Sequence, residues 1–150
     1  GEVGRLAEAE QLLSGLADGF QTARRMREVL DCRYRLACLA QDRDDLSRAL
    51  EQFELCFSID ASHLPTLLRY GGLLTSHARW EDAIRVLQSA LLQQSKLETP
   101  DRVTLFWQLG QARQALGENR KARDMYSRVI NLNADHAEAR EALDQLEDLA

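Results

Sequence analysis

The sequence is poor in the residues that interrupt helices. Its 150 residues include only 2 prolines and 8 glycines. Proline breaks a helix because it lacks an amide hydrogen, and glycine weakens one through backbone entropy. Alternating runs of Val, Ile and Thr, which are typical of strands, are absent as well. The chain is instead rich in good helix formers such as Ala, Leu, Glu, Gln and Arg. This composition predicts an all-α protein without a sheet.

A surplus of positive charge is also missing. The formal net charge is −5, whereas nucleic-acid binding depends on Lys and Arg side chains that neutralise phosphates. No apolar stretch approaches the length that crosses a bilayer. We therefore expect neither a nucleic-acid partner nor a transmembrane segment. The sequence starts at Gly1 rather than Met, so we expect a fragment from which a targeting signal can be missing.

Motifs for catalysis or metal binding are lacking too. Cys32, Cys38 and Cys56 are odd in number and form no CxxC pair, which favours reduced thiols in the cytoplasm over a disulfide between two of them. No His-x3-His pair or Cys/His cluster has the spacing of metal ligands. Nucleophile-elbow, P-loop and zinc-hydrolase motifs do not occur. We predict no catalytic residue, no metal and no cofactor, and expect that the chain is not an enzyme.

A pattern of small and large residues occurs three times. In each unit a small residue is followed twelve positions later by Ala, and a large apolar residue comes four positions after that Ala. The units are Ala37, Ala49 and Phe53; Gly71, Ala83 and Leu87; and Gly110, Ala122 and Tyr126. The central Ala residues are 34 and then 39 residues apart, and the longer step contains the polar stretch 93–100. Small residues let two helices approach closely, so the repeat predicts stacked helix pairs.

The third unit carries the most specific signal, because it resembles a tetratricopeptide repeat. The pattern of that family is W-x2-L-G-x2-Y…A-x3-F…P. The matching residues are Phe106, Leu109, Gly110, Ala122 and Tyr126, and the departures are Arg113 in the Tyr slot and Ala134 in the Pro slot. The resemblance implies an α-solenoid of stacked antiparallel helix pairs with a C-terminal capping helix. Gly117 is expected to end the first helix of this unit in a left-handed conformation.

On this pattern residues 1–150 form a single domain. The expected parts are a partial unit with N-terminal helices at 1–29, repeats at 30–63, 64–102 (with the insertion) and 103–136, and a capping helix at 137–150. Residues 4–18 are predicted to form one helix, similar to the second helix of an earlier unit, with Ala9 and Leu13 in the Ala and Phe slots. Asp135 and Glu138 have the spacing that is typical of a helix start.

In this family the first helix of each pair lines a concave groove that binds a protein or peptide. The resemblance implies that twelve side chains face it: Tyr34, Arg35, Cys38, Gln41, Leu68, Arg69, Gly72, Thr75, Trp107, Gln108, Gln111 and Gln114. Trp107 is the sharpest candidate, because buried aromatic side chains carry much of the energy at interfaces. The alternative for Trp107 is core packing beside Phe106, since only one of two adjacent helical residues points inward.

Arg35 and Arg69 occupy equivalent positions and predict a partner with an acidic segment or a C-terminal carboxylate. The alternative is that both arginines are solvated or pair with nearby acids. The Lys/Asn/Arg clamp with which some members of the family hold chaperone tails is missing, because its sites hold Tyr34, Cys38, Gly72 and Trp107. We therefore argue against a co-chaperone of that kind.

The expected function is that of a scaffold that recruits a protein or extended peptide without catalysis. One alternative is a structural spacer, monomeric or weakly self-associating, in which the N-terminal half-unit seeks a missing helix from another chain. Another is a domain that positions the substrate of a larger enzyme.

Overall fold

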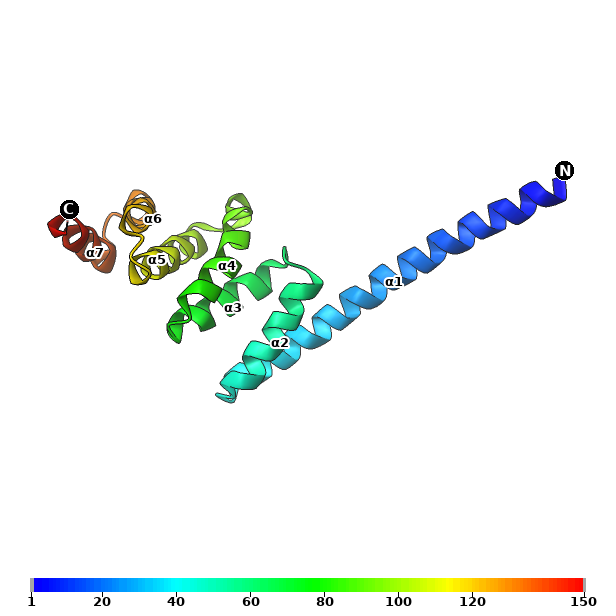
Figure 1. The fold of residues 1–150 in the computed structure, drawn as a ribbon, viewed down its shortest axis with the longest axis horizontal. Helices are drawn as coiled ribbons and strands as arrows, with labels where there is room; N and C mark the ends of the chain where they lie inside the picture. The colour runs from blue at the N-terminus through cyan, green and yellow to red at the C-terminus, as the bar shows by residue number, and fades with distance from the viewer. Residues whose placement is uncertain (1, 150) are drawn as a thin grey trace. The chain divides into compact units, whose positions relative to one another are not determined.

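The structure is a computed structural model that describes residues 2–149, with the backbone alone for Ala17. Residues 1 and 150, which bound the predicted domain, lie outside this range. The described residues form helices and no strand, as predicted (Figure 1). The elements are α1 (Glu2–Asp42), α2 (Leu46–Ile59), α3 (Leu64–Ser76), α4 (Trp80–Leu91), the 3-10 helix η1 (Gln94–Lys96), α5 (Thr99–Ala115), α6 (Asn119–Leu132) and α7 (Ala137–Asp148). In these residues no helix combines the length and the hydropathy needed to cross a membrane.

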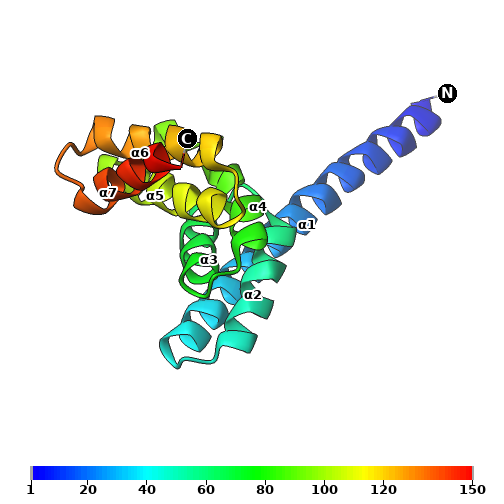
Figure 2. The same cartoon turned by 60° about the vertical axis from the view of Figure 1, so that its left-hand side comes forward.

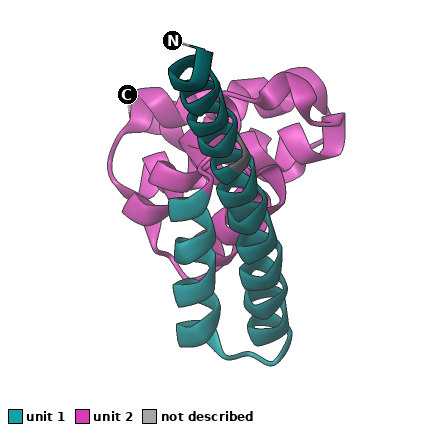
Figure 3. Cartoon of the chain, turned by 90° about the vertical axis from the view of Figure 1, so that its right-hand side faces the viewer, with its two compact units in different colours: residues 1–59 teal, residues 60–150 magenta. Residues whose placement is uncertain are grey.

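The chain divides into two compact units, residues 1–59 and residues 60–150 (Figure 3). In the first unit α2 packs along the C-terminal part of α1. In the second unit α3 pairs with α4, α5 pairs with α6, and α7 packs against α6 (Figure 2). α5 also touches both α3 and α4, so the two pairs of this unit are stacked. This is the predicted arrangement of helix pairs.

Each helix pair is joined by the same tight turn. The second residue after the first helix has a left-handed backbone in all three turns, at Asp44 (φ 57°), Ala78 (φ 56°) and Gly117 (φ 78°). The next amide donates to a carbonyl five residues back, and the N···O distance is 2.9 Å in each turn. This is the Schellman pattern, which satisfies carbonyls at a helix end. The predicted cap at Gly117 is therefore confirmed.

The repeated small residues lie where the paired helices touch. Ala49, Ala83 and Ala122 are fully buried. A Cβ atom on Gly110 would collide with the ring of Tyr126, and one on Gly71 would collide with Leu87. In the second and third units the large residue therefore occupies the space that the small residue leaves, as the repeat predicts.

The N-terminal segment differs from its prediction. Residues 4–18 are helical, but α1 runs without a break from Glu2 to Asp42, so the expected helix end near residue 18 is wrong. Ala9 and Leu13 are exposed rather than packed as in a repeat. The physical reason is that residues 19–29 contain no proline and are mostly helix formers, while nothing in the described chain packs against this segment as a first helix would.

Candidate functional site

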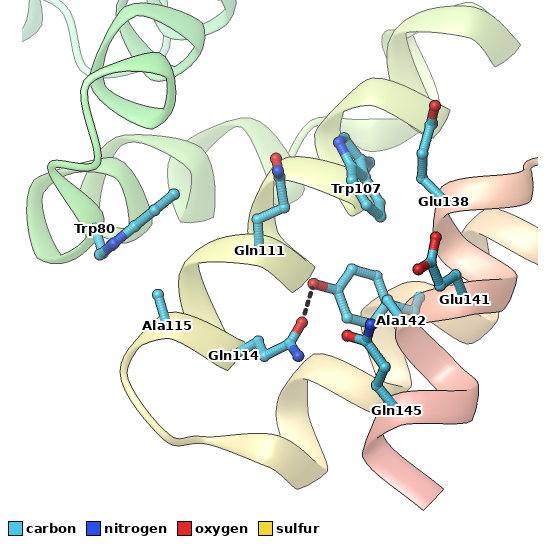
Figure 4. A pocket seen from close by; sticks show the side chains of 10 residues that line it. Trp80, Trp107, Gln111, Gln114, Ala115, Glu138, Glu141, Ala142 and Gln145 are labelled. Carbon is cyan, nitrogen blue, oxygen red and sulfur yellow. Dashed lines mark hydrogen bonds between the residues drawn. The ribbon is translucent and has the colours of Figure 1, made fainter.

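A pocket of about 500 Å³ opens in the second unit between α5 and α7 (Figure 4). The described residues that line it are Trp80, Trp107, Gln111, Gln114, Ala115, Tyr126, Glu138, Glu141, Ala142 and Gln145. Trp80 is the first residue of α4, and Tyr126 belongs to α6. Side chains of α5 and side chains of α7 face one another across it. We call this hollow the α5–α7 pocket.

Trp107 forms an aromatic wall of the pocket. Its ring centroid lies 5.3 Å from that of Tyr126 and 5.1 Å from that of His136. The neighbouring Phe106 is buried against Val129 of α6, and helical periodicity turns the next side chain about 100° away from that contact. Trp107 is half-buried: it packs on rings beneath it and still faces the pocket. Trp107 therefore packs on the core, as the alternative expected, and also lines the pocket; that it binds a partner stays a prediction.

Tyr126 connects the pocket to the core of the α5–α6 pair. Its hydroxyl donates a hydrogen bond of 2.7 Å to Oε1 of Gln114, which is drawn in Figure 4. Burial raises the pKa of Tyr126 to about 12, because a phenolate would lose its hydration there. The hydroxyl therefore stays protonated at neutral pH and keeps Gln114 oriented. The amide nitrogen of Gln114 remains to donate to other groups.

His136 begins α7 and orients its first turn. Its Nδ1 accepts a hydrogen bond of 3.1 Å from the amide of Ala139. The helix start was predicted, but the capping side chain is His136 rather than Asp135. Because Nδ1 accepts, a neutral ring carries its proton on Nε2. That atom lies 3.7 Å from Oε2 of Glu138, whose side chain is mostly exposed at the rim of the pocket.

The pocket has an acidic rim. Glu138 and Glu141 contribute carboxylates, and no Lys or Arg is among its described lining residues. The two cations of α6 nearest in sequence to Tyr126 are engaged elsewhere. Arg123 donates to the carbonyl of Leu146 (3.4 Å), and Arg128 pairs with Asp124 (3.5 Å). Aromatic faces, amides and carboxylates therefore meet without a compensating positive charge.

The structure gathers only some of the predicted groove residues. Trp107, Gln111 and Gln114 line the α5–α7 pocket. Gln108 lies beside α3, since its Nε2 is 3.5 Å from the place of a Cβ on Gly72. Leu68 and Arg69 are half-buried on α3. Thr75 is buried and donates to the carbonyl of Gly71 (2.8 Å), so little of it is left for a partner.

The predicted residues of the first unit do not line the α5–α7 pocket. Tyr34 is half-buried and meets the ring of Phe53 edge-on at 6.3 Å. Cys38 and Gln41 are half-buried as well. Arg35 is exposed in a separate hollow of about 410 Å³, whose lining also includes Glu28 and Asp31.

Sequence reasoning missed the wall that α7 supplies. Glu138, Glu141 and Gln145 belong to a helix that was expected only to cover the end of the stack. Trp80 was not predicted as a pocket residue either. Two features of the sequence could have pointed to these residues. One is a Trp at a helix start, and the other is a pair of Glu residues one turn apart at the start of α7.

The described residues offer no group of three or more His, Cys, Asp and Glu side chains that could hold a metal ion. The three cysteines are free thiols: Cys32 is exposed, Cys38 is half-buried and Cys56 is buried. The lining of the α5–α7 pocket offers aromatic faces for stacking, amides for hydrogen bonds and carboxylates for charge pairing.

Comparisons with known proteins agree with the arrangement of stacked helix pairs. Residues 103–136 match the family model described as the tetratricopeptide repeat. The crystal structure of MamA protein superposes with a TM-score of 0.70 at 23% identity, over 81% of this chain and 63% of that one, which is less than two thirds of its length. The TPR domain of Arabidopsis OM64 gives a TM-score of 0.65 at 14% identity, over 81% of this chain and 96% of that one.

A third similar structure contains a ligand. It is the second TPR domain of human RPAP3 in complex with an HSP70 peptide, with a TM-score of 0.64, 16% identity, and coverage of 81% of this chain and 98% of that one. At these identities the similar structures establish the fold alone. No curated protein sequence matches this chain.

Proposed function

We propose that the second unit of this chain, which contains a tetratricopeptide repeat at residues 103–136 within its stacked helix pairs, binds an extended segment of a partner protein in the α5–α7 pocket. The chain is a protein-interaction module, and the pocket is its anchor site. The peptide complex of the RPAP3 domain supports this mode of use for the fold. The reading of residues 1–150 as one domain is part of the proposal.

The half-buried ring of Trp107 is the observation that carries the proposal. It is supported from below by Tyr126 and His136 and is open on its other side. A large aromatic side chain that is already held in place loses little entropy when a partner covers it. Gln111 and Gln114 stand one turn apart on the same helix beside it. Their amides can pair with the backbone of an extended peptide.

The charge of the pocket favours a basic side chain of the partner. Trp107 offers a π face, and Glu138 and Glu141 offer carboxylates, with no cation among the described lining residues. A Lys or Arg side chain within about 6 Å of an indole face is attracted by the ring. A carboxylate of the partner would be repelled by Glu138 and Glu141 in the same place. The proposed ligand is therefore a segment with Lys or Arg flanked by apolar residues.

The acidic partner expected from Arg35 and Arg69 is the second candidate. Arg35 is exposed, which favours it, but Glu28 and Asp31 line the same hollow and offset its charge. Arg69 is half-buried and already engaged within the chain. These contacts make either arginine a weaker site for an acidic segment than the α5–α7 pocket is for a basic one.

We propose further that the module acts without catalysis. Recognition chemistry is what the described pockets offer, and tetratricopeptide repeats generally serve as interaction modules. Three free thiols, one of them exposed, support a reducing compartment such as the cytoplasm. A role in positioning the substrate of a larger enzyme is compatible with the same pocket and makes the substrate a protein.

A positional-scanning library of dye-labelled peptides tests the proposal, with binding to the whole chain measured by fluorescence anisotropy of the peptide. We expect enrichment of Lys or Arg at one position. The Glu141→Lys variant should raise the dissociation constant of the enriched peptide roughly fivefold, because an exposed charge pair contributes at most about 1 kcal/mol. Glu147→Lys is the matched control, because it makes the same change on an exposed part of α7 outside the pocket. Enrichment of Asp or Glu would instead support the acidic candidate.

Trp107→Ala should abolish binding in the same assay. Thermal unfolding followed by circular dichroism controls for the stacking that this variant also loses. Binding that survives both Trp107→Ala and Glu141→Lys in a folded chain would refute the α5–α7 pocket as the site.

A further inference from the structure

The free segment of α1, residues 2–27, carries an uncovered apolar seam. Large exposed residues recur on it at Leu6, Leu13, Leu16 and Phe20, with exposed fractions of 65%, 66%, 59% and 74%. Their spacings are seven, three and four residues, and Ala9 and Ala23 complete the series, which is that of positions a and d in a heptad repeat. On a helix these positions form one stripe, which is the seam along which two helices pair.

The same stripe is covered in the remainder of α1. Continuing the heptads leads to Leu30 and Ala37, which are buried, and to Tyr34, which contacts Phe53 of α2. α2 packs on this part of α1 and does not reach the free segment (Figure 3). The C-terminal part of the stripe thus packs on α2, while the same heptad positions in residues 2–27 stay exposed within the described chain.

A solitary helix of this kind lacks a source of stability. Helices in water depend on packing of an apolar face more than on intrinsic propensity. Gly4, Gly15 and Gly19 weaken the segment further, and nothing lies near enough to require glycine at these places. The free segment is about 39 Å long at 1.5 Å per residue, which gives room for more than three heptads. A second helix that packs on the seam supplies the stability that the helix propensity of the segment does not.

Charge along the helix indicates what that covering helix is. Residues 2–18 contain four acidic residues and one Arg. Residues 19–27 contain three Arg and no acidic residue. The two ends of the segment therefore have opposite net charge. A second copy that lies antiparallel places the acidic end of one helix on the basic end of the other.

We propose that the free segment pairs antiparallel with the free segment of a second copy of this chain. Confining the contact to residues that α2 leaves open fixes the register: Leu6 packs on Ala23 of the other copy and Phe20 on Ala9, with Leu13 against Leu16. Each layer then joins large to small or two of equal size. In the same register Arg27, at position a, meets Glu2, at position d, of the other copy. This inference concerns a different surface from the α5–α7 pocket and does not depend on it.

A parallel pair of helices is less favourable both in the charges that meet and in the packing of the layers. It stacks identical positions, so that Arg27 meets Arg27 and Glu2 meets Glu2 in the seam, where like charges repel. It also places Ala9 on Ala9 and Ala23 on Ala23, which leaves gaps beside the larger layers. The antiparallel register removes both defects.

Sedimentation equilibrium of the whole chain over a range of concentrations tests the pairing. We expect a reversible monomer–dimer equilibrium. Leu13→Asp should raise the dimer dissociation constant by about tenfold or more, because each dimer then buries two unpaired carboxylates. Leu92→Asp is the matched control, since Leu92 is 88% exposed and lies outside α1. A chain that stays monomeric at its highest soluble concentration overturns the proposal, whatever else covers the seam.

A charge swap tests the orientation. In the antiparallel register, Arg27→Glu and Glu2→Arg each create two repulsive contacts and weaken the dimer, while the double variant restores the pairs and the affinity. In a parallel dimer the single variants only replace one like pair with another, so none of the three variants changes the affinity much. A double variant that fails to recover the affinity lost in the singles refutes the antiparallel register.

Discussion

α1 and α5 are both long helices with glycine in their interior, but the glycines have opposite surroundings. Gly110 of α5 stands against the ring of Tyr126, and a Cβ atom there would collide with it. A Cβ atom on Gly15 or Gly19 of α1 would have nothing within 4 Å. Glycine costs a helix about 1 kcal/mol relative to alanine in either place. Only in α5 does the approach of another helix compensate for that cost.

The difference teaches that a small residue in a helix has meaning only together with its neighbour. In the α5–α6 pair the small residue and the large residue sixteen positions later form one contact, and the contact fixes the distance between the helices. In the free segment of α1, the small residues Ala and Gly make no such contact with another helix of the described chain. Matched Gly→Ala variants in the two helices therefore separate packing from propensity, because the propensity gain is common to both.

The largest expected effect is that of Gly110→Ala. The added methyl group meets a ring that is fully buried and hydrogen-bonded to Gln114, so the ring cannot turn away. Overpacking of this kind costs about 1–3 kcal/mol, and we expect a net loss of about 2 kcal/mol in the free energy of unfolding. The measurement is urea unfolding followed by circular dichroism. Equal stability of the variant and the natural chain would contradict the close contact.

Removing the hydroxyl of Tyr126 should have the next largest effect. Tyr126→Phe keeps the ring against Gly110 but loses the hydrogen bond to Gln114. One such bond contributes about 1 kcal/mol net, so urea unfolding at neutral pH should show a loss of that order. The loss is smaller than for Gly110→Ala because no atom has to move.

The same variant has a distinctive pH dependence. The pKa of Tyr126 is raised to about 12 from 10.0, so below pH 10 the residue is protonated in both the folded and the unfolded chain. Between pH 10 and 12 the unfolded chain loses this proton and the folded chain keeps it, so stability falls as pH rises. Tyr126→Phe lacks that decline. The stability difference between the two proteins should therefore shrink above pH 10, and a constant difference would argue against a buried phenol.

The packing of the repeats could be predicted because it is local in sequence. Gly71 with Leu87 and Gly110 with Tyr126 are sixteen residues apart, and steric fit alone relates them. The rotation of a helix about its axis is harder to infer. Whether Phe106 or Trp107 faced the core depended on where α6 and α7 lie, and the structure places Phe106 inside with Trp107 at the pocket wall.

The N-terminal segment shows where the repeat pattern misleads. Ala9 and Leu13 fit the spacing of Ala and Phe in a repeat, and the sequence contains nothing that distinguishes a packed Ala from an exposed one. What the repeat pattern could not supply was the partner helix, which this segment lacks among the described residues. The pocket wall of α7 was missed for a related reason, because Glu138 and Glu141 look like the polar surface of any terminal helix.

Gly71→Ala should destabilise less than the change at Gly110. Its collision is with the end of the Leu87 side chain, which can change rotamer, whereas the ring of Tyr126 is fixed. The gain of helix propensity offsets much of the remaining strain. We expect a net loss of about 0.5 kcal/mol by urea unfolding. A loss as large as that of Gly110→Ala would mean that Leu87 is as rigid as the ring.

Gly15→Ala should act in the opposite direction and most weakly. No atom meets the new methyl group, so the substitution leaves only the gain in helix propensity, about 0.5–1 kcal/mol. The gain acts on the local opening of α1 and not on the unfolding of the second unit. Amide hydrogen exchange of residues 2–27 should therefore slow by roughly two- to fivefold, while the urea transition stays unchanged. Gly15 lies at heptad position c, outside the seam, so the slowing is expected in the monomer as well as in the dimer. Exchange that slows only at concentrations where the chain dimerises would mean that pairing, rather than propensity, holds the helix together.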